Sequence, residues 1–96
     1  MYVGICQVEF SVLDSVSLKD KRRVVRSLKD RLHRSHQVSV AEVGRLEDRR
    51  VAMLGVGVVS GSSSRAREVL EGIVEGLRSD ARLELMGHQI EVLSGE

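Results

Sequence analysis

The sequence predicts an α+β fold of order βαββαβ, with two helices on one face of a four-stranded antiparallel sheet. Residues with strand-like patterns fall at 2–13, 37–43, 51–60 and 83–93, and apolar residues recur at helical spacing in 17–35 and 62–79. With right-handed crossovers, the economical solution for this order is a ferredoxin-like sandwich. The 96 residues suffice for one such core and not for two, so we expect a single domain over 1–96.

The first predicted strand shows a clear alternation of apolar and polar residues. Cys6, Val8, Phe10 and Val12 alternate with Gln7, Glu9 and Ser11. This period of two is typical of a half-buried strand. Cys6 is the only cysteine, and its place in the apolar set predicts a buried thiol in a reducing compartment.

Residues 17–35 are predicted to form an amphipathic, strongly basic helix. Ser17, followed by Asp20 three residues later, resembles a short capping box. The apolar stripe consists of Leu18, Val24, Val25, Leu28 and Leu32, and the opposite side carries Lys19, Arg22, Arg23, Arg26, Lys29, His33 and Arg34, with Asp30 among them. Segment 17–36 has eight basic and two acidic residues, which gives +6, while the rest has seven basic and twelve acidic residues, which gives −5.

The one-sided charge of this helix has two interpretations. Any amphipathic helix needs a charged solvent side, but such a side usually mixes Glu with Lys four residues apart. Most cations here have no such partner, which favours contact with phosphates. The residues predicted to make these contacts are Lys19, Arg22, Arg23, Arg26 and Lys29.

Lys21 is the exception, because its spacing to Val25 and Leu28 places it within the apolar stripe. The favoured interpretation is a snorkelling lysine whose ammonium reaches water. A buried ion pair with Glu9 or Glu42 is the second interpretation, and an anion-binding lysine is the third.

The second half of the chain contains a predicted hairpin, the second helix and the last strand. Residues 44–50 are highly charged and predict a hairpin connection between two strands. Ser62, Ser63 and Ser64 are candidate caps for the second helix, a commoner role than anion binding. Gly72 and Gly76 within that helix either permit close packing or weaken it, and a bulge is expected near Gly87.

Several classes of function are disfavoured by the residues present. His33, His36 and His88 lack supporting cysteines or carboxylates, so no metal site is expected. The glycines of 55–61 do not match a dinucleotide-binding motif, and no nucleophile or base set is recognisable. We therefore expect no enzyme activity and no cofactor. Without a signal-peptide pattern or a long apolar run, we expect a cytoplasmic protein without a membrane span.

The sheet face opposite the helices is predicted to lie uncovered. It would carry Val3 and Ile5 of the first strand and, on the third, either Val51, Met53 and Val59 or the residues that alternate with them. Exposed apolar surface of this kind marks a partner or dimer interface, so we expect a homo-oligomer formed through this face. The third strand has no aromatic residue, which disfavours single-strand binding by base stacking.

Three segments resemble the YlxP-like family, small bacterial proteins of unknown function. These are Ser17 to Arg23 together with 27–32, the strand Val38 to Val43, and the later run Val56 to Ser60. The resemblance covers nearly the whole chain and implies a ferredoxin-like fold. The resemblance also implies a genomic setting, since in some bacteria genes of such proteins often lie near those of translation and ribosome-maturation factors. The hairpin 44–50 lacks the aromatic residue that the family often has there.

Together these observations favour a non-enzymatic accessory protein that binds structured RNA, such as ribosomal RNA, through its basic helix. The alternative is a homodimeric protein–protein interaction module that does not bind nucleic acid.

Overall fold

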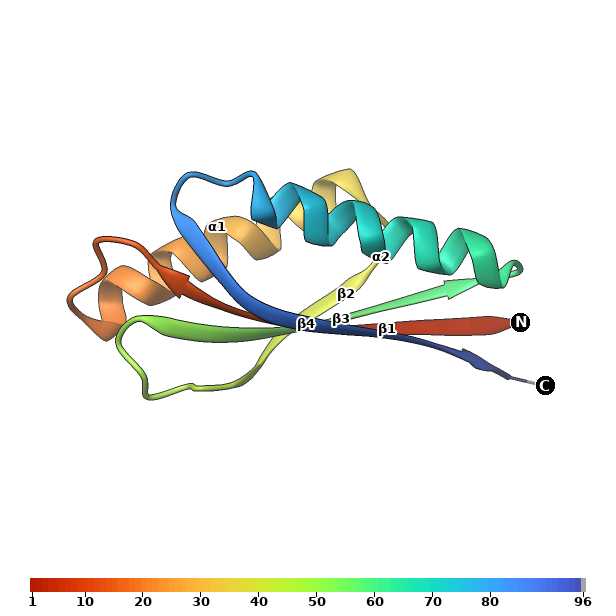
Figure 1. Cartoon of the computed structure of the whole chain (residues 1–96), viewed down its shortest axis with the longest axis horizontal. Helices are drawn as coiled ribbons and strands as arrows, with labels where there is room; N and C mark the ends of the chain where they lie inside the picture. The colour runs from red at the N-terminus through yellow and green to blue at the C-terminus, as the bar shows by residue number, and fades with distance from the viewer. Residues whose placement is uncertain (96) are drawn as a thin grey trace.

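A computed structural model describes residues 1–95. The elements follow the predicted order, as Figure 1 shows. They are β1 (Tyr2–Val12), α1 (Leu18–Ser35), β2 (Ser39–Gly44), β3 (Val51–Ser60), α2 (Ser63–Arg78) and β4 (Leu83–Ser94).

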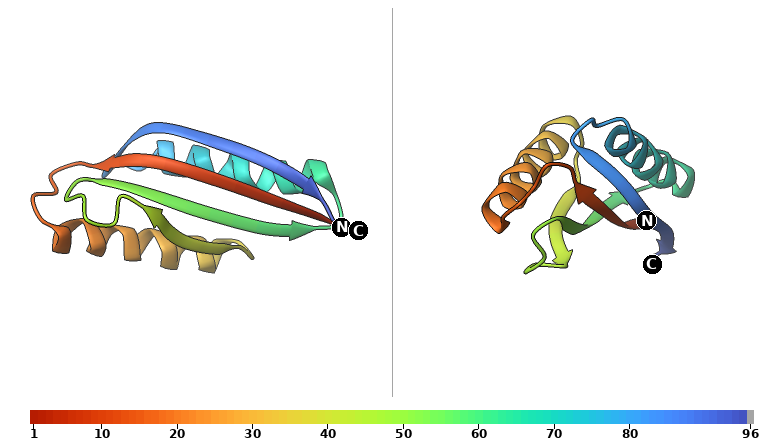
Figure 2. Two further views of the ribbon diagram at one scale, coloured as in Figure 1. Left: turned by 90° about the horizontal axis from the view of Figure 1, so that it is seen from below. Right: turned by 60° about the vertical axis from the view of Figure 1, so that its left-hand side comes forward.

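The four strands form one antiparallel sheet in the order β2-β3-β1-β4. Figure 2 shows the strands side by side with both helices on one side of them. Helix α2 packs on β4, β1 and β3, and α1 packs on β2 and β3. This arrangement confirms the predicted ferredoxin-like sandwich, and it leaves the second face of the sheet without a covering layer.

The core lies between the helices and the sheet. Cys6, Val8, Phe10 and Val12 of β1 are buried there, as their alternation predicted. From α1 the core receives Val25, Leu28 and Leu32, and from α2 it receives Ala66, Leu70, Ile73, Val74 and Leu77. Both aromatic residues, Tyr2 and Phe10, stand at even positions of β1 and therefore point toward the helices.

The ends of the helices are fixed by the predicted caps. The Ser17 hydroxyl accepts a hydrogen bond from the Asp20 backbone N–H at 3.1 Å, while the Asp20 carboxylate accepts one from the Val16 N–H at 3.2 Å. Ser62 caps α2 in the same way by accepting from the Arg65 N–H. Strand β2 begins two residues later than predicted, because pairing with β3 starts at Ser39 while Val38 packs on the core without pairing.

Two irregularities shape the strands. The register of β4 against β1 shifts between Leu85 and Gly87, so Met86 is an extra residue and the predicted bulge is confirmed. Val43 is the extra residue of β2, and its side chain lies over Gly55 of β3. A Cβ atom at Gly55 would come within 2.9 Å of the Val43 side chain, which explains a glycine at this position.

Candidate nucleic-acid interface

The five residues predicted to contact phosphates lie on the outer side of α1, away from the sheet. We call Lys19, Arg22, Arg23, Arg26 and Lys29 the basic face. Lys29 is half-buried and the other four are exposed. The 18 residues of α1 span about 27 Å, so the basic face is a long, narrow band rather than a compact cluster.

No residue of the basic face is in an ion pair within residues 1–95. Arg31, on the side of α1 that faces the α2–β4 connection, behaves differently. Its guanidinium lies 3.2 Å from the Asp80 carboxylate, which also accepts from Arg82 at 2.8 Å. The cation at the edge of α1 is thus neutralised within the protein, whereas the outer cations have no partner carboxylate in residues 1–95.

One carboxylate interrupts the band. Asp30 is exposed on the same side of α1, between Arg26 and Arg34 in helical spacing. With Arg34 added to the basic face, the outer side of α1 has six cations against Asp20 and Asp30, a net charge of +4. Asp20 lies in the first turn, where its carboxylate accepts from the Val16 N–H, so Asp30 is the carboxylate that interrupts the length of the band.

Lys21 does not reach water, and the favoured snorkelling interpretation is wrong. Its side chain is 0% exposed. The ammonium donates to the Arg45 carbonyl at 2.7 Å and to the Val51 carbonyl at 3.1 Å, and it lies 3.1 Å from the Glu42 carboxylate. That carboxylate oxygen falls outside hydrogen-bond geometry, so the contact is ionic. The ion pair with Glu42, which was the second interpretation, is what the fold contains.

The reason Lys21 can be buried lies in the loop between β2 and β3. Its two carbonyl partners are at either side of this loop, and Glu42 stands on the face of β2 that α1 covers. Two carbonyl acceptors and one carboxylate therefore converge on one ammonium, and together they replace the hydration that burial removes. The alternative partner, Glu9, is instead paired with Arg45 at 3.0 Å.

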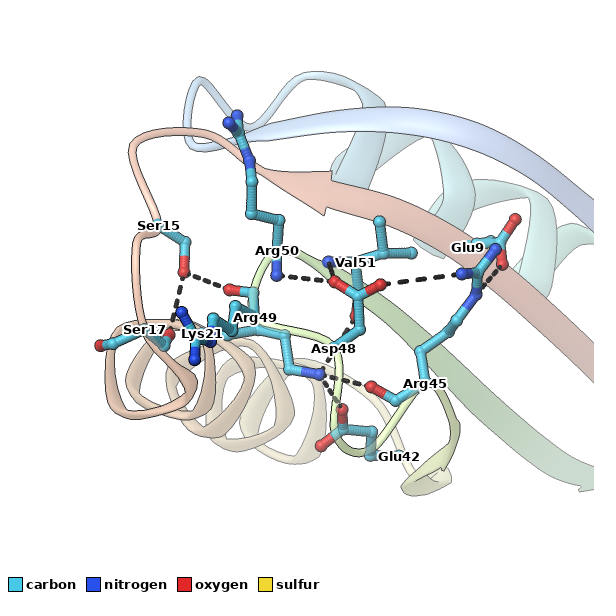
Figure 3. A network of polar contacts seen from close by, with 10 residues as sticks. All are labelled: Glu9, Ser15, Ser17, Lys21, Glu42, Arg45, Asp48, Arg49, Arg50 and Val51. Atoms are coloured by element: carbon cyan, nitrogen blue, oxygen red, sulfur yellow. Dashed lines mark hydrogen bonds and ion pairs between the residues drawn. The ribbon is translucent and has the colours of Figure 1, made fainter.

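The loop itself, residues 45–50, is held by further polar contacts, which Figure 3 shows. The Asp48 carboxylate accepts hydrogen bonds from the backbone N–H groups of Arg50 and Val51, both at 2.8 Å. These hydrogen bonds, above all the one from the Val51 N–H, hold the pKa of Asp48 below its usual range. Arg45, with a positive φ of 60°, bridges Glu9 and Asp48.

The loop is also tied to the connection that precedes α1. The buried Ser15 hydroxyl donates to the Arg49 carbonyl at 2.7 Å. Ser15 is two residues before Ser17, the cap of α1. Hydrogen bonds therefore link the β2–β3 loop to the first turn of α1 and to the connection before it. Sequence patterns did not reveal this link, because the acceptors are backbone carbonyls far away along the chain.

The cysteine and the three histidines lie in different surroundings. Burial raises the pKa of the Cys6 thiol to about 11, so it is protonated at neutral pH. His33 and His88 are exposed and His36 is half-buried. Within residues 1–95, no three His, Cys, Asp or Glu side chains gather into a group that could hold a metal ion.

The uncovered sheet face has a shallow groove with a volume of about 520 Å³. Gly55 and Gly57 form its floor, with Ser39, Ala41 and Val43 on the β2 side and Ile5, Gln7, Gln89 and Glu91 on the β1 and β4 side. Beside it, pairing places Leu93, Val3 and Val59 in one apolar row across β4, β1 and β3. Val59 and Leu93 are 66% and 45% exposed.

None of the helices within the described part of the chain has the length and apolar character needed to cross a bilayer. Fold and surface together define a small ferredoxin-like domain with a basic helix on one layer and a bare sheet face on the other.

Residues 3–90 match the model of a family described as protein of unknown function, DUF503. The chain belongs to this family. It is 26% identical over 82 residues to the uncharacterized protein YlxP of Bacillus subtilis (strain 168), a match that covers 85% of this chain and 89% of that protein. The resemblance drawn from the sequence motifs is thereby confirmed.

A solved structure similar to this one is a de novo designed protein with a ferredoxin fold, determined by solution NMR. The TM-score is 0.61 at 16% sequence identity, over 99% of this chain and 89% of the designed one. At this identity the likeness concerns the fold alone.

Proposed function

We propose that this protein is a non-enzymatic, cytoplasmic accessory protein that binds structured RNA through α1, with ribosomal RNA as one candidate. The observation that carries the proposal is the set of five basic-face cations without an ion pair in residues 1–95. Unpaired cations along a rigid helix offer phosphates direct contact and release of counterions.

The mode of binding follows from which side chains are accessible. Both aromatic residues point into the helix-covered side of the sheet, so the bare face has no platform on which bases could stack. That face also carries Glu9, Glu84 and Glu91, which repel phosphates. Recognition is therefore by the positions of phosphates along a folded RNA rather than by base edges.

The test is binding to an RNA duplex of about 16 base pairs, the span covered by a double-stranded RNA-binding domain. Affinity measured against salt concentration should fall with a log–log slope of roughly −0.7 to −0.9 for each phosphate contacted, and hence about −3.5 to −4.5 for five contacts. Arg22→Ala with Arg26→Ala should reduce the magnitude of that slope by about 1.4 to 1.8.

The matched control removes the same charge from the other helix. Arg65 and Arg67 of α2 are exposed, and the double variant Arg65→Ala, Arg67→Ala should keep the wild-type slope. Affinity that does not depend on salt, or equal losses in the two double variants, would exclude the proposed surface.

A second candidate function is favoured by the bare sheet face. We propose that a second copy of the chain covers it. The apolar row of Val3, Val59 and Leu93 lies beside the glycine-floored groove, so two copies related by a two-fold axis would each place a row against the partner's groove. At about 4.8 Å between strands and 3.3 Å per residue, the face has a projected area of about 600 Å², near the roughly 800 Å² per partner of a standard interface.

Light scattering tests this dimer. Wild-type protein should have twice the mass of one chain, and the double variant Val59→Gln, Leu93→Gln should have the mass of one. Val16 and Leu46 are similarly exposed but belong to connections rather than to strands, so Val16→Gln with Leu46→Gln is the neutral control. A monomeric wild type at high concentration would remove the dimer and leave RNA binding unaffected.

A further inference from the structure

Arg49 stands outside the predicted basic face but is held against the start of α1. Its carbonyl oxygen accepts from the buried Ser15 hydroxyl at 2.7 Å. Lys21 of α1 bonds the carbonyls of Arg45 and Val51, which flank Arg49 on both sides. The backbone at Arg49 is therefore fixed relative to the first turn of α1, even though 24 residues separate Lys21 from Arg45.

The side chain of Arg49 is not used by the loop. Arg45 is bound by Glu9 and Asp48, and Asp48 is engaged by the backbone of Arg50 and Val51. Arg49 is exposed and makes no ion pair within residues 1–95. Figure 3 shows its side chain on the α1 side of the loop, extending toward Ser17.

We propose that Arg49 is a further phosphate contact, which extends the basic face from α1 onto the β2–β3 loop. This inference rests on the proposed RNA binding and specifies it. A guanidinium can bind one phosphate with two parallel hydrogen bonds. Because its backbone is already fixed, binding costs less ordering entropy than it would for an arginine on a mobile loop.

The placement also favours one class of ligand. The contacts on α1 and the contact at Arg49 come from two elements whose relative positions are locked by Lys21 and Ser15. A rigid array of cations matches phosphates that hold fixed positions, as in a duplex, better than those of a flexible single strand. We therefore expect tighter binding to a duplex RNA than to either of its separated strands at equal salt.

The test compares Arg49→Ala with Arg67→Ala, which removes an exposed arginine from α2. On the same duplex of about 16 base pairs, Arg49→Ala should reduce the magnitude of the salt slope by roughly 0.7 to 0.9, the value of one phosphate contact, and Arg67→Ala should leave it unchanged. The urea midpoint of Arg49→Ala should stay at the wild-type value, because the Arg49 side chain has no ion-pair partner among residues 1–95 to lose.

The outcomes separate this inference from the proposed function. If Arg22→Ala with Arg26→Ala lowers the slope but Arg49→Ala behaves like Arg67→Ala, Arg49 is not a contact and the basic face stands alone. If wild-type protein does not bind the duplex, or binds without salt dependence, both proposals fail. Equal affinity for duplex and single strands would overturn the preference for a duplex.

Discussion

Lys21 shows how a single residue can connect elements that the sequence keeps apart. Its spacing placed it correctly in the apolar stripe of α1. Whether its ammonium is buried or reaches water depends on Glu42 and on two loop carbonyls. No periodic pattern in the sequence shows that these three groups come together. A snorkelling lysine is the commoner outcome at such positions because two acceptors and a counter-charge seldom meet a buried ammonium.

Removing the Lys21 ammonium should therefore be costly. Lys21→Met leaves the Glu42 carboxylate, only 15% exposed, without its counter-charge, and we expect a loss of about 3–5 kcal/mol in the free energy of unfolding. Urea denaturation would measure it. Adding Glu42→Leu should recover much of the loss, while Lys19→Met on the exposed side should change stability by less than about 0.5 kcal/mol. A Lys21→Met variant as stable as Lys19→Met would show that the buried pair is unimportant.

Asp80 provides a pH-dependent contribution to stability. The Arg82 side chain above all, together with the Arg82 N–H and Arg31, lowers the pKa of Asp80 from 3.8 to about 2. Because the pKa is depressed in the folded state, this stabilisation is present above the unfolded pKa and is lost as pH falls from about 4 toward 2. The difference in unfolding free energy between wild type and Asp80→Asn should accordingly be largest near neutral pH and shrink over that window. A difference independent of pH would contradict the assignment.

The helices and strands were predictable to different degrees. Both helices were located from apolar spacing and serine caps, and β3 has the predicted bounds. The start of β2 was misplaced because Val38 is apolar and buried but unpaired, and apolarity alone cannot distinguish packing from pairing. The sequence likewise identified the basic face but not Arg49, since the loop's position beside α1 depends on backbone acceptors.

Helix α2 contains two glycines that no packing requires. A Cβ atom at Gly72 or Gly76 would meet nothing within 4 Å, so of the two interpretations the structure supports a weakened helix. Gly72→Ala and Gly76→Ala should each raise the unfolding free energy by about 0.5–1 kcal/mol, measured by urea denaturation.

Gly4 is the contrasting glycine for that experiment. A Cβ atom there would lie 2.9 Å from Leu70 and 3.0 Å from Val58, both in the core. Gly4→Ala should therefore destabilise the protein while the α2 substitutions stabilise it. Destabilisation by Gly72→Ala or Gly76→Ala would contradict the open space beside these two glycines.

Across the whole molecule, the two proposed surfaces lie on opposite layers. Helix α1 covers the sheet on one side and the apolar row with its groove lies on the other, so the two proposed occupants would approach from different sides (Figure 1). A dimer through the bare face would carry one basic band on each outer side. Such a dimer would bind RNA at two places, each through the same basic band that a single chain uses.

Bivalency gives a prediction in which both proposals must hold. On a duplex of about 16 base pairs, which one basic band occupies, the monomeric variant Val59→Gln, Leu93→Gln should keep the wild-type affinity and salt slope. On a long folded RNA with several duplexes, the dimer should bind about 100-fold or more tightly than this variant, because the second contact is made at a high effective concentration. Titrations of both RNAs, with Val16→Gln, Leu46→Gln as control, measure the difference. Equal affinities for the long RNA would mean that the two bands do not act together, since a monomer and a bivalent dimer cannot have the same avidity.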